Sequence, residues 1–299
     1  MDQILSTAIL CFVFGAIVGS FLGVCVYRIP MARYEPVREG IRELAAPISI
    51  FKPARSFCPQ CERQLVWYHN VPVVSYLLLR GRCAYCAAAI PFRYLLIELL
   101  TGTLCTATYL RFGLTPTAYA AFALVCALIV IAFIDLDYMI IPDIITLPGT
   151  ILGLALAATN QYYSAQSRVL FYAPFALNLH ESVLGLLCGP VLLLAVWALY
   201  WLIRRREGLG LGDIKLLAVL GAACGPECAW FTILVGSILG SLFGFAGILF
   251  KRTSFTSYIP FGPYLVVAAL AYVFKPHALL MYLFTHEGPS PWRVLQGIW

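Results

Sequence analysis

The sequence predicts an all-α polytopic membrane protein with about eight transmembrane helices and a small polar insert after the first helix. Of its 299 residues, 62% are hydrophobic and only 11% are charged, whereas about 25% of an ordinary soluble domain is charged. Several uninterrupted apolar runs approach or exceed the ~20 residues that a helix needs to cross a bilayer. This composition excludes a water-soluble globular domain and a disordered chain. The 11 cysteines are too few for a disulfide-stabilised scaffold of this length.

Eight apolar segments are the candidate transmembrane helices. The first has a single early charge, Asp2, and is longer than the apolar core of a signal peptide, so we expect a retained helix. The sixth and eighth are short, and each could be a half-helix buried in protein, which leaves the count at seven to nine. The segments cover residues 4–27, 95–111, 117–134, 144–160, 182–203, 214–224, 229–250 and 263–274.

The positive charges predict how these segments are oriented. If the N-terminus is outside, the loops on one side of the membrane hold 16 of the 20 lysines and arginines. The positive-inside rule makes that side cytoplasmic. The net charge of +6 therefore reports orientation, and we expect no nucleic-acid partner. Three parts follow: a first transmembrane helix at 1–27, a cytoplasmic insert at 28–94 and a transmembrane bundle at 95–299.

Two CxxC pairs in the insert predict a structural zinc site. Cys58 and Cys61 are separated from Cys83 and Cys86 by 21 residues, which is close to the spacing of four-cysteine zinc sites. Four thiolates at about 2.3 Å complete a tetrahedral Zn2+ and leave no open position, so such a metal is structural and not catalytic. It would supply part of the folding free energy of a small polar insert. A pair of redox dithiols is the alternative.

Aspartates lie at two places beside the apolar segments. Asp135, Asp137 and Asp143 lie at the junction of the third and fourth segments, and Asp213 lies at the start of the sixth. Carboxylates are costly in a membrane and are usually functional there. The charge-based topology places both groups on the cytoplasmic side, so two of them can form a dyad. One carboxylate would activate water while the other, protonated, donates to a carbonyl oxygen.

The residues before Asp213 suit such a dyad. Gly210 and Gly212 have no Cβ, so the backbone can unwind and a substrate backbone can approach the carboxylate closely. Helix capping is the alternative role for Asp213 at the start of the sixth segment and for Asp143 at the start of the fourth.

Together these motifs resemble the type IV prepilin peptidases, membrane aspartyl proteases with a GxGD signature. The turn from Gly210 to Asp213 resembles that signature, and Asp135 with Pro142 and Asp143 resembles the other aspartate motif of the family. Further landmarks occur in family order at residues 19–30, 58–61, 67–72, 75–76, 80–83, 93–94, 98–102 and 259–263.

The resemblance implies a bifunctional enzyme of the bacterial inner (cytoplasmic) membrane, with its bundle at 95–299 acting as the protease. Such an enzyme cuts the basic leader from type IV prepilins or type II secretion pseudopilins after a Gly, at the cytoplasmic membrane face. It then N-methylates the new terminus with S-adenosylmethionine. Prepilin or pseudopilin substrates and membrane lipid are therefore the expected partners.

The resemblance also assigns the site residues. Asp213 matches one catalytic aspartate, and Asp135 is preferred to Asp137 for the other because short relatives keep an Asp seven residues before the Pro. The residues expected to support the active site are Gly210, Gly212, Pro142 and Asp143.

One residue departs from the family pattern. The first family motif usually reads GSFLNV, and here Gly23 replaces the Asn, which leaves the aspartate pair intact and concerns the methylation side. The chain has no glycine-rich Rossmann fingerprint, so spacing does not locate the methyl donor. Outside this family, the alternative is a transporter that uses the same carboxylates as a proton or cation relay.

Overall fold

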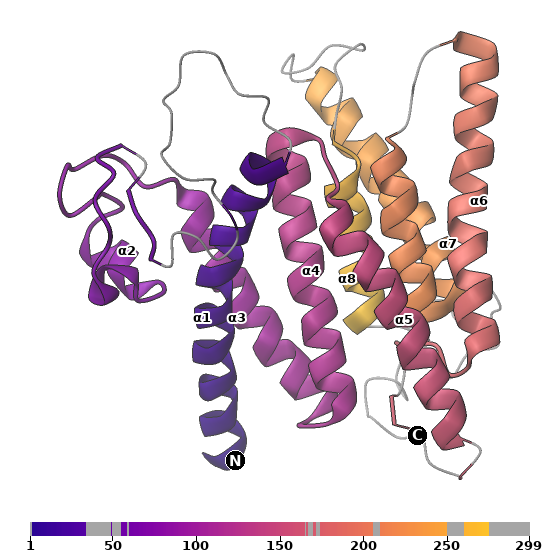
Figure 1. The fold of residues 1–299 in the computed structure, drawn as a ribbon, viewed down its shortest axis with the longest axis horizontal. Coiled ribbons are helices and arrows are strands. Elements are labelled where there is room, and N and C mark those ends of the chain that lie inside the picture. The colour runs from indigo at the N-terminus through magenta and orange to yellow at the C-terminus, as the bar shows by residue number, and fades with distance from the viewer. Residues whose placement is uncertain are drawn as a thin grey trace. The chain divides into compact units, whose positions relative to one another are not determined.

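A computed structural model gives the fold and describes residues 2–33, 49, 55–58, 60–164, 166, 170–171, 174–205, 210–249 and 260–274. Residues 34–48, 50–54 and 59 of the predicted insert lie outside this set. Within it the regular structure is helical, and the strand-like pairings are two isolated bridges (Figure 1). The prediction of an all-α protein is confirmed. The chain divides into two compact units, Met1–Tyr138 and Met139–Trp299.

The first unit holds three long helices and the insert. The long helices are α1 (Asp2–Arg33), α3 (Phe92–Phe112) and α4 (Pro116–Tyr138), and the insert contains the short helices η1 (Trp67–Asn70) and α2 (Val74–Leu78). Helix α1 is longer than the predicted 4–27, because it continues through Pro30 to Arg33. Helices α1, α3 and α4 pack on one another.

A row of glycines brings α1 close to α3. Gly15, Gly19 and Gly23 recur every four residues and so lie on one face of α1. A Cβ at Gly19 would lie 2.8 Å from the Cα of Glu98 in α3, and one at Gly15 would lie 2.5 Å from the Cβ of Cys105. Small residues let helix backbones approach in a membrane, where packing replaces the hydrophobic effect as the attraction between helices.

The second unit holds α5 (Asp143–Ser164), α6 (Leu179–Arg204), α7 (Leu211–Leu249) and α8 (Gly262–Phe274). Side-chain hydrogen bonds similar to those of a capping box start α6. The Asn178 side chain accepts a hydrogen bond from the N–H of Glu181 at 2.8 Å, and the Glu181 carboxylate accepts one from the N–H of Leu177 at 3.0 Å. Helix α7 packs against α5, α6 and α8 and is the centre of this unit.

Helix α7 is two antiparallel legs joined at Gly225. This glycine has φ 81° and ψ 179°, a conformation that is essentially restricted to glycine. A Cβ at Gly189 of α6 would lie 3.0 Å from the Cβ of Ala229 and 3.4 Å from that of Leu217. A continuous helix would place residues 217 and 229 about 18 Å apart. The chain therefore reverses at Gly225, and residues 211–224 and 226–249 are separate legs.

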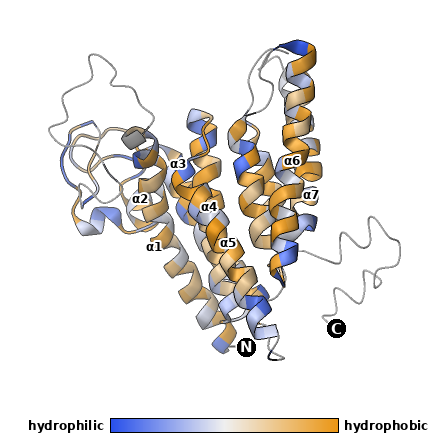
Figure 2. Ribbon diagram, turned by 45° about the vertical axis from the view of Figure 1, so that its right-hand side comes forward, coloured by the Kyte–Doolittle hydropathy of each residue, from blue (hydrophilic) through white to orange (hydrophobic). Residues whose placement is uncertain are grey.

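The helices have the lengths and surfaces of membrane spans. Six helices, α1 and α3 to α7, are long and apolar enough to cross a bilayer, and α8 is a shorter apolar helix. Because α7 contributes two legs, the described residues hold the eight apolar helical segments that the sequence predicted. Figure 2 shows apolar residues along most of each helix. Many are exposed, such as Leu10 at 68% and Leu202 at 61%, as expected for side chains that face lipid.

Candidate functional site

The two CxxC pairs form matching turns in the insert. In the first, the N–H of Glu62 donates to the carbonyl of Cys58 at 2.8 Å, and in the second the N–H of Ala87 donates to the carbonyl of Cys83 at 3.0 Å. Glu62 and Ala87 follow the second cysteine of each pair, and both have φ 57°. An isolated bridge closes each turn, at residues 57 and 64 and at residues 82 and 89.

These turns bring the four predicted cysteine ligands together. The sulfurs of Cys58, Cys61, Cys83 and Cys86 all lie within 4.8 Å of one another. A tetrahedral zinc with four sulfurs at about 2.3 Å needs sulfur–sulfur distances of about 3.8 Å. The Sγ atoms of Cys58 and Cys86 are 3.8 Å apart. The geometry therefore fits a four-coordinate zinc ion.

Backbone hydrogen bonds favour the thiolate form of Cys83, one cysteine of this cluster. The backbone N–H groups of Tyr85 and Cys86 lower the pKa of the Cys83 thiol from its usual 9.0 to about 7, since a hydrogen bond to the charged form favours that form. Metals bind the thiolate and not the thiol. At Cys83, the fold of the turn thus favours the ionisation state that a bound metal requires.

The last turn of α4 holds both candidate aspartates, Asp135 and Asp137, in different environments. Asp135 is buried, with 6% of its surface exposed. Asp137 lies at the surface and forms an ion pair with Arg93 of α3, the two side chains being 31% and 32% exposed. The neighbouring Leu136 is exposed. Two residues along one helix turn therefore point into different surroundings.

The predicted glycine turn precedes Asp213 at the start of α7. Asp213 is buried, with 6% of its surface exposed, and its backbone N–H donates to the carbonyl of Gly210 at 3.2 Å. A Cβ at Gly210 would lie 3.3 Å from Oδ2 of Asp213, and one at Gly212 would lie 2.9 Å from the Cβ of Ile141. A side chain at Gly210 would crowd the carboxylate. One at Gly212 would displace the start of α7 from the segment before α5.

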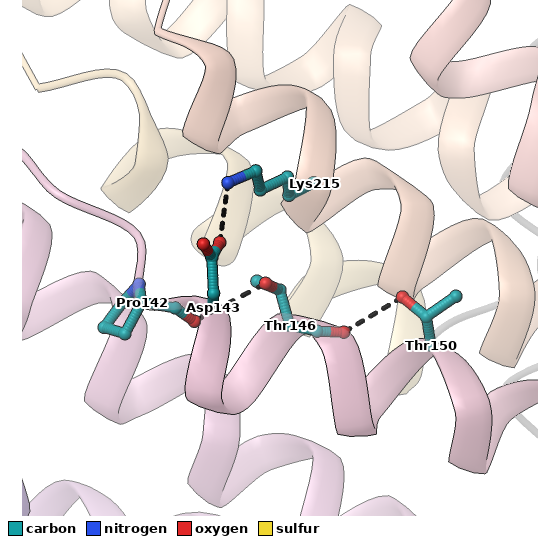
Figure 3. A network of polar contacts seen from close by, with 5 residues as sticks. All are labelled: Pro142, Asp143, Thr146, Thr150 and Lys215. Atoms are coloured by element: carbon teal, nitrogen blue, oxygen red, sulfur yellow. Dashed lines mark hydrogen bonds and ion pairs between the residues drawn. The ribbon is translucent and has the colours of Figure 1, made fainter.

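Pro142 and Asp143 lie at the start of α5, close to the start of α7. The Asp143 carboxylate accepts a hydrogen bond from Lys215 of α7, with 2.6 Å between Oδ1 and Nζ (Figure 3). The pair is partly exposed. The carbonyl of Pro142 accepts hydrogen bonds from the N–H of Ile145 at 3.1 Å and of Thr146 at 3.2 Å. Pro142 therefore supports the first turn of α5, and Asp143 joins α5 to α7 close to Asp213.

The structure thus groups the predicted residues in two sets. The four cysteines and Asp135 belong to the first unit, and Asp213, the two glycines, Pro142 and Asp143 belong to the second. Sequence reasoning gave no role to Glu98, although it is an acidic residue in an apolar helix, which is itself a signal of function. In the structure its carboxylate holds the backbone of the insert, through a 2.7 Å hydrogen bond from the N–H of Val73.

Two stretches of the chain match known families. Residues 13–112 match the bacterial peptidase A24 N-terminal domain, and residues 122–245 match the type IV leader peptidase family.

Relatives that match most of the chain are named as enzymes of this family. A prepilin leader peptidase/N-methyltransferase of Aeromonas hydrophila is 36% identical over 273 residues, which cover 87% of each chain. The protein of that name from Stutzerimonas stutzeri is 34% identical over 272 residues, covering 87% of this chain and 88% of its own. A third, from Burkholderia pseudomallei strain 1026b, is 36% identical over 281 residues, which cover 90% of this chain and 86% of its own. No solved structure matches the chain.

Proposed function

Since the chain belongs to the type IV leader peptidase family, we propose that it cleaves prepilins with Asp135 and Asp213 and then methylates the new N-terminus. The protein is an enzyme of the prepilin leader peptidase/N-methyltransferase type, as its relatives along most of the chain are named. The transporter alternative gains no support from these relatives.

One observation supports this pair of aspartates above the others. Asp135 and Asp213 are the two buried carboxylates of the residues that the structure describes, whereas Asp137 is paired with Arg93 and Asp143 with Lys215. Acidic side chains are costly to bury in a membrane protein and usually mark a functional site there. Burial thus supports Asp135 and Asp213 as the catalytic pair, while their ion pairs give Asp137 and Asp143 a structural role.

The positions of the two aspartates at helix ends favour one as the general base and the other as the general acid. Asp213 lies in the first turn of α7, where the partial positive charge of the helix N-terminus stabilises an anion. Asp135 lies in the last turn of α4, where the negative end of the helix opposes one. We assign Asp213 as the base that activates water and Asp135 as the acid that donates to the scissile carbonyl. Two such carboxylates share one proton in an aspartic protease.

The location of the reaction follows from the charge distribution. The apolar helices make this a multi-pass membrane protein, consistent with the inner membrane. We place the N-terminus outside and the insert, with both aspartates, on the cytoplasmic side that holds 16 of the 20 positive residues. The apolar segment of a prepilin or pseudopilin would lie in the bilayer, with its basic leader in the cytosol.

The cofactors have separate tasks. The four cysteines would hold a structural zinc ion, which fixes the insert and leaves no position for substrate. A methyltransferase needs a methyl donor, which we take to be S-adenosylmethionine. The donor supplies an electrophilic methyl group, and the chain has to hold it next to the new amino terminus.

Mass spectrometry of a prepilin peptide incubated with the purified protein and S-adenosylmethionine tests this function. Wild type should cut after the Gly and add the mass of one methyl group. Asp135→Ala and Asp213→Ala should each lower cleavage by at least about a hundredfold, the usual contribution of a general acid or base. Asp137→Ala is the matched control and should cleave normally. No cleavage by zinc-loaded wild type on several prepilins, or normal cleavage by Asp135→Ala, would refute the assignment.

A further inference from the structure

A pocket lies in the first unit between α1, the start of α3 and the zinc insert. Its volume is about 250 Å³ and it is open on one side, close to the lower end of small-molecule sites at ~300 Å³. Helix α1 contributes Ser20, Val24 and Tyr27, which recur at the spacing of one helix face. The pocket suits part of an extended small molecule and is too small for a folded substrate.

The walls of this pocket are chemically mixed. Glu98 supplies a carboxylate and Arg28 a guanidinium, and the rings of Tyr27, Tyr94 and His69 line the same space. Arg28 is 4% exposed, so its charge is held inside the protein. The Nδ1 atom of His69 is buried and has no hydrogen-bond partner among the described residues. A buried nitrogen of this kind is costly unless a ligand or water satisfies it.

This set of groups matches the methyl donor. S-adenosylmethionine has a flat adenine base, a sulfonium cation, an α-ammonium group and an α-carboxylate. Aromatic rings attract both a flat base and a cation. A carboxylate can counter the sulfonium, and a guanidinium is the best side chain for binding a carboxylate. Glu98 and Arg28 would thus pair the sulfonium and the α-carboxylate of the donor, and neither pairs its α-ammonium group.

The zinc site forms part of the same wall. Cys58 and Cys83, one from each CxxC turn, line the pocket. Glu98 also holds the insert in place through its 2.7 Å hydrogen bond from the N–H of Val73. A metal in the cysteine cluster would therefore support the donor pocket without touching the reaction.

Resting on the proposed function, we propose that this pocket is the S-adenosylmethionine site, with Glu98 beside the sulfonium and the zinc turns forming its outer wall. Methylation and cleavage are then served by different residues. Gly23 also fits this scheme, since a Cβ there would lie 3.1 Å from Cδ1 of Tyr94, a wall residue. The residue that departs from the family pattern therefore lies next to a wall residue of the proposed donor pocket.

Direct binding of tritiated S-adenosylmethionine to the detergent-solubilised full chain tests the site. Val24→Trp should fill the pocket and weaken donor binding at least tenfold. Ile17→Trp is the matched control, because Ile17 is on the same helix but 56% exposed, and it should bind normally. Zinc content, measured in every variant, reports whether the insert is folded.

The role of Glu98 has its own readout. Glu98→Gln keeps an oxygen for the N–H of Val73 but removes the charge. S-adenosylhomocysteine is the donor without its transferable methyl group, and it therefore lacks the sulfonium charge. The preference of wild type for the donor over this product should therefore fall at least severalfold in Glu98→Gln and stay unchanged in Glu227→Gln, an exposed control. An unchanged preference in Glu98→Gln would overturn this role.

The possible failures are distinguishable. Equal donor affinity in Val24→Trp and Ile17→Trp would overturn the pocket while leaving cleavage and methylation standing. Wild type that cleaves but neither binds the donor nor methylates would overturn the pocket and the methylation activity together. Wild type that binds the donor in this pocket but does not cleave would uphold the pocket and refute the peptidase.

Discussion

Glu98 of α3 accepts a hydrogen bond from the backbone N–H of Val73 in the insert, with 2.7 Å between Oε2 and N. Val73 has φ 62° and ψ −51°, and the N–H of Val74 donates to the carbonyl of Pro72 at 2.6 Å. Val73 is thus the central residue of the rare, strained type of γ-turn. Such a conformation costs on the order of 1–3 kcal/mol and persists only where its surroundings hold it. The membrane helix therefore holds a strained turn of the cysteine-containing insert.

Removing this acceptor should loosen the insert. Glu98→Ala leaves the N–H of Val73 without its acceptor, which costs about 1–3 kcal/mol. We expect zinc to be released to a chelator severalfold faster than from wild type, as measured with a colorimetric zinc indicator. Glu98→Gln, which keeps an oxygen acceptor, should release zinc at close to the wild-type rate. Equal rates for the alanine and glutamine variants would show that this hydrogen bond does not hold the insert.

Zinc binding should release more protons at lower pH. The pKa of Cys83 is lowered from 9.0 to about 7 by the N–H groups of Tyr85 and Cys86, so the metal-free thiol is mostly ionised at pH 8 and mostly protonated at pH 6. Zinc must then displace nearly one more proton at pH 6, and its affinity should fall as the pH drops through 7. Calorimetry in buffers of different ionisation enthalpy counts these protons. The same count at pH 6 and pH 8 would contradict the lowered pKa.

The ion pair between Asp143 and Lys215 should support the site without being essential. The two side chains are 38% and 46% exposed, and such pairs contribute about 0.2–1 kcal/mol. Asp143→Asn and Lys215→Gln should each lower cleavage by less than about tenfold, and the double variant should lose no more than either single change, since all three break one pair. A loss in Asp143→Asn as large as that in Asp213→Asn would instead place Asp143 in the catalytic machinery.

The reversal of α7 should depend on Gly225. An alanine there would have to adopt φ 81° and ψ 179°, at a cost of about 1–3 kcal/mol or more. We expect Gly225→Ala to lower the thermal unfolding midpoint by several degrees in detergent. Gly240→Ala is the control, because it is helical and its Cβ would meet only ordinary contacts at 3.5 Å. Equal midpoints for the two variants would argue against the hairpin.

The fold could be predicted from the sequence wherever the signal was local. Apolar length placed the helices, and the predicted break between 214–224 and 229–250 is the hairpin at Gly225. The CxxC spacing predicted the cysteine cluster, because each turn is built within a few residues. The predicted end of the first helix was wrong. We predicted residue 27, whereas α1 continues to Arg33 through Pro30, a residue that is unfavourable inside a helix.

By itself, the sequence determined the membrane class, the polar insert, the four cysteines and the short list of aspartates, because composition, run length and spacing are properties of neighbouring residues. Only the tertiary structure decided how those residues are used. It paired Asp137 with Arg93, Asp143 with Lys215 and Glu98 with Val73, across 44, 72 and 25 residues of chain. Such contacts depend on which helix faces pack together. A membrane helix is apolar on nearly all sides, so its sequence does not reveal which face contacts another helix. Packing also buried Asp135 and Asp213, and it formed the pocket beside the CxxC turns.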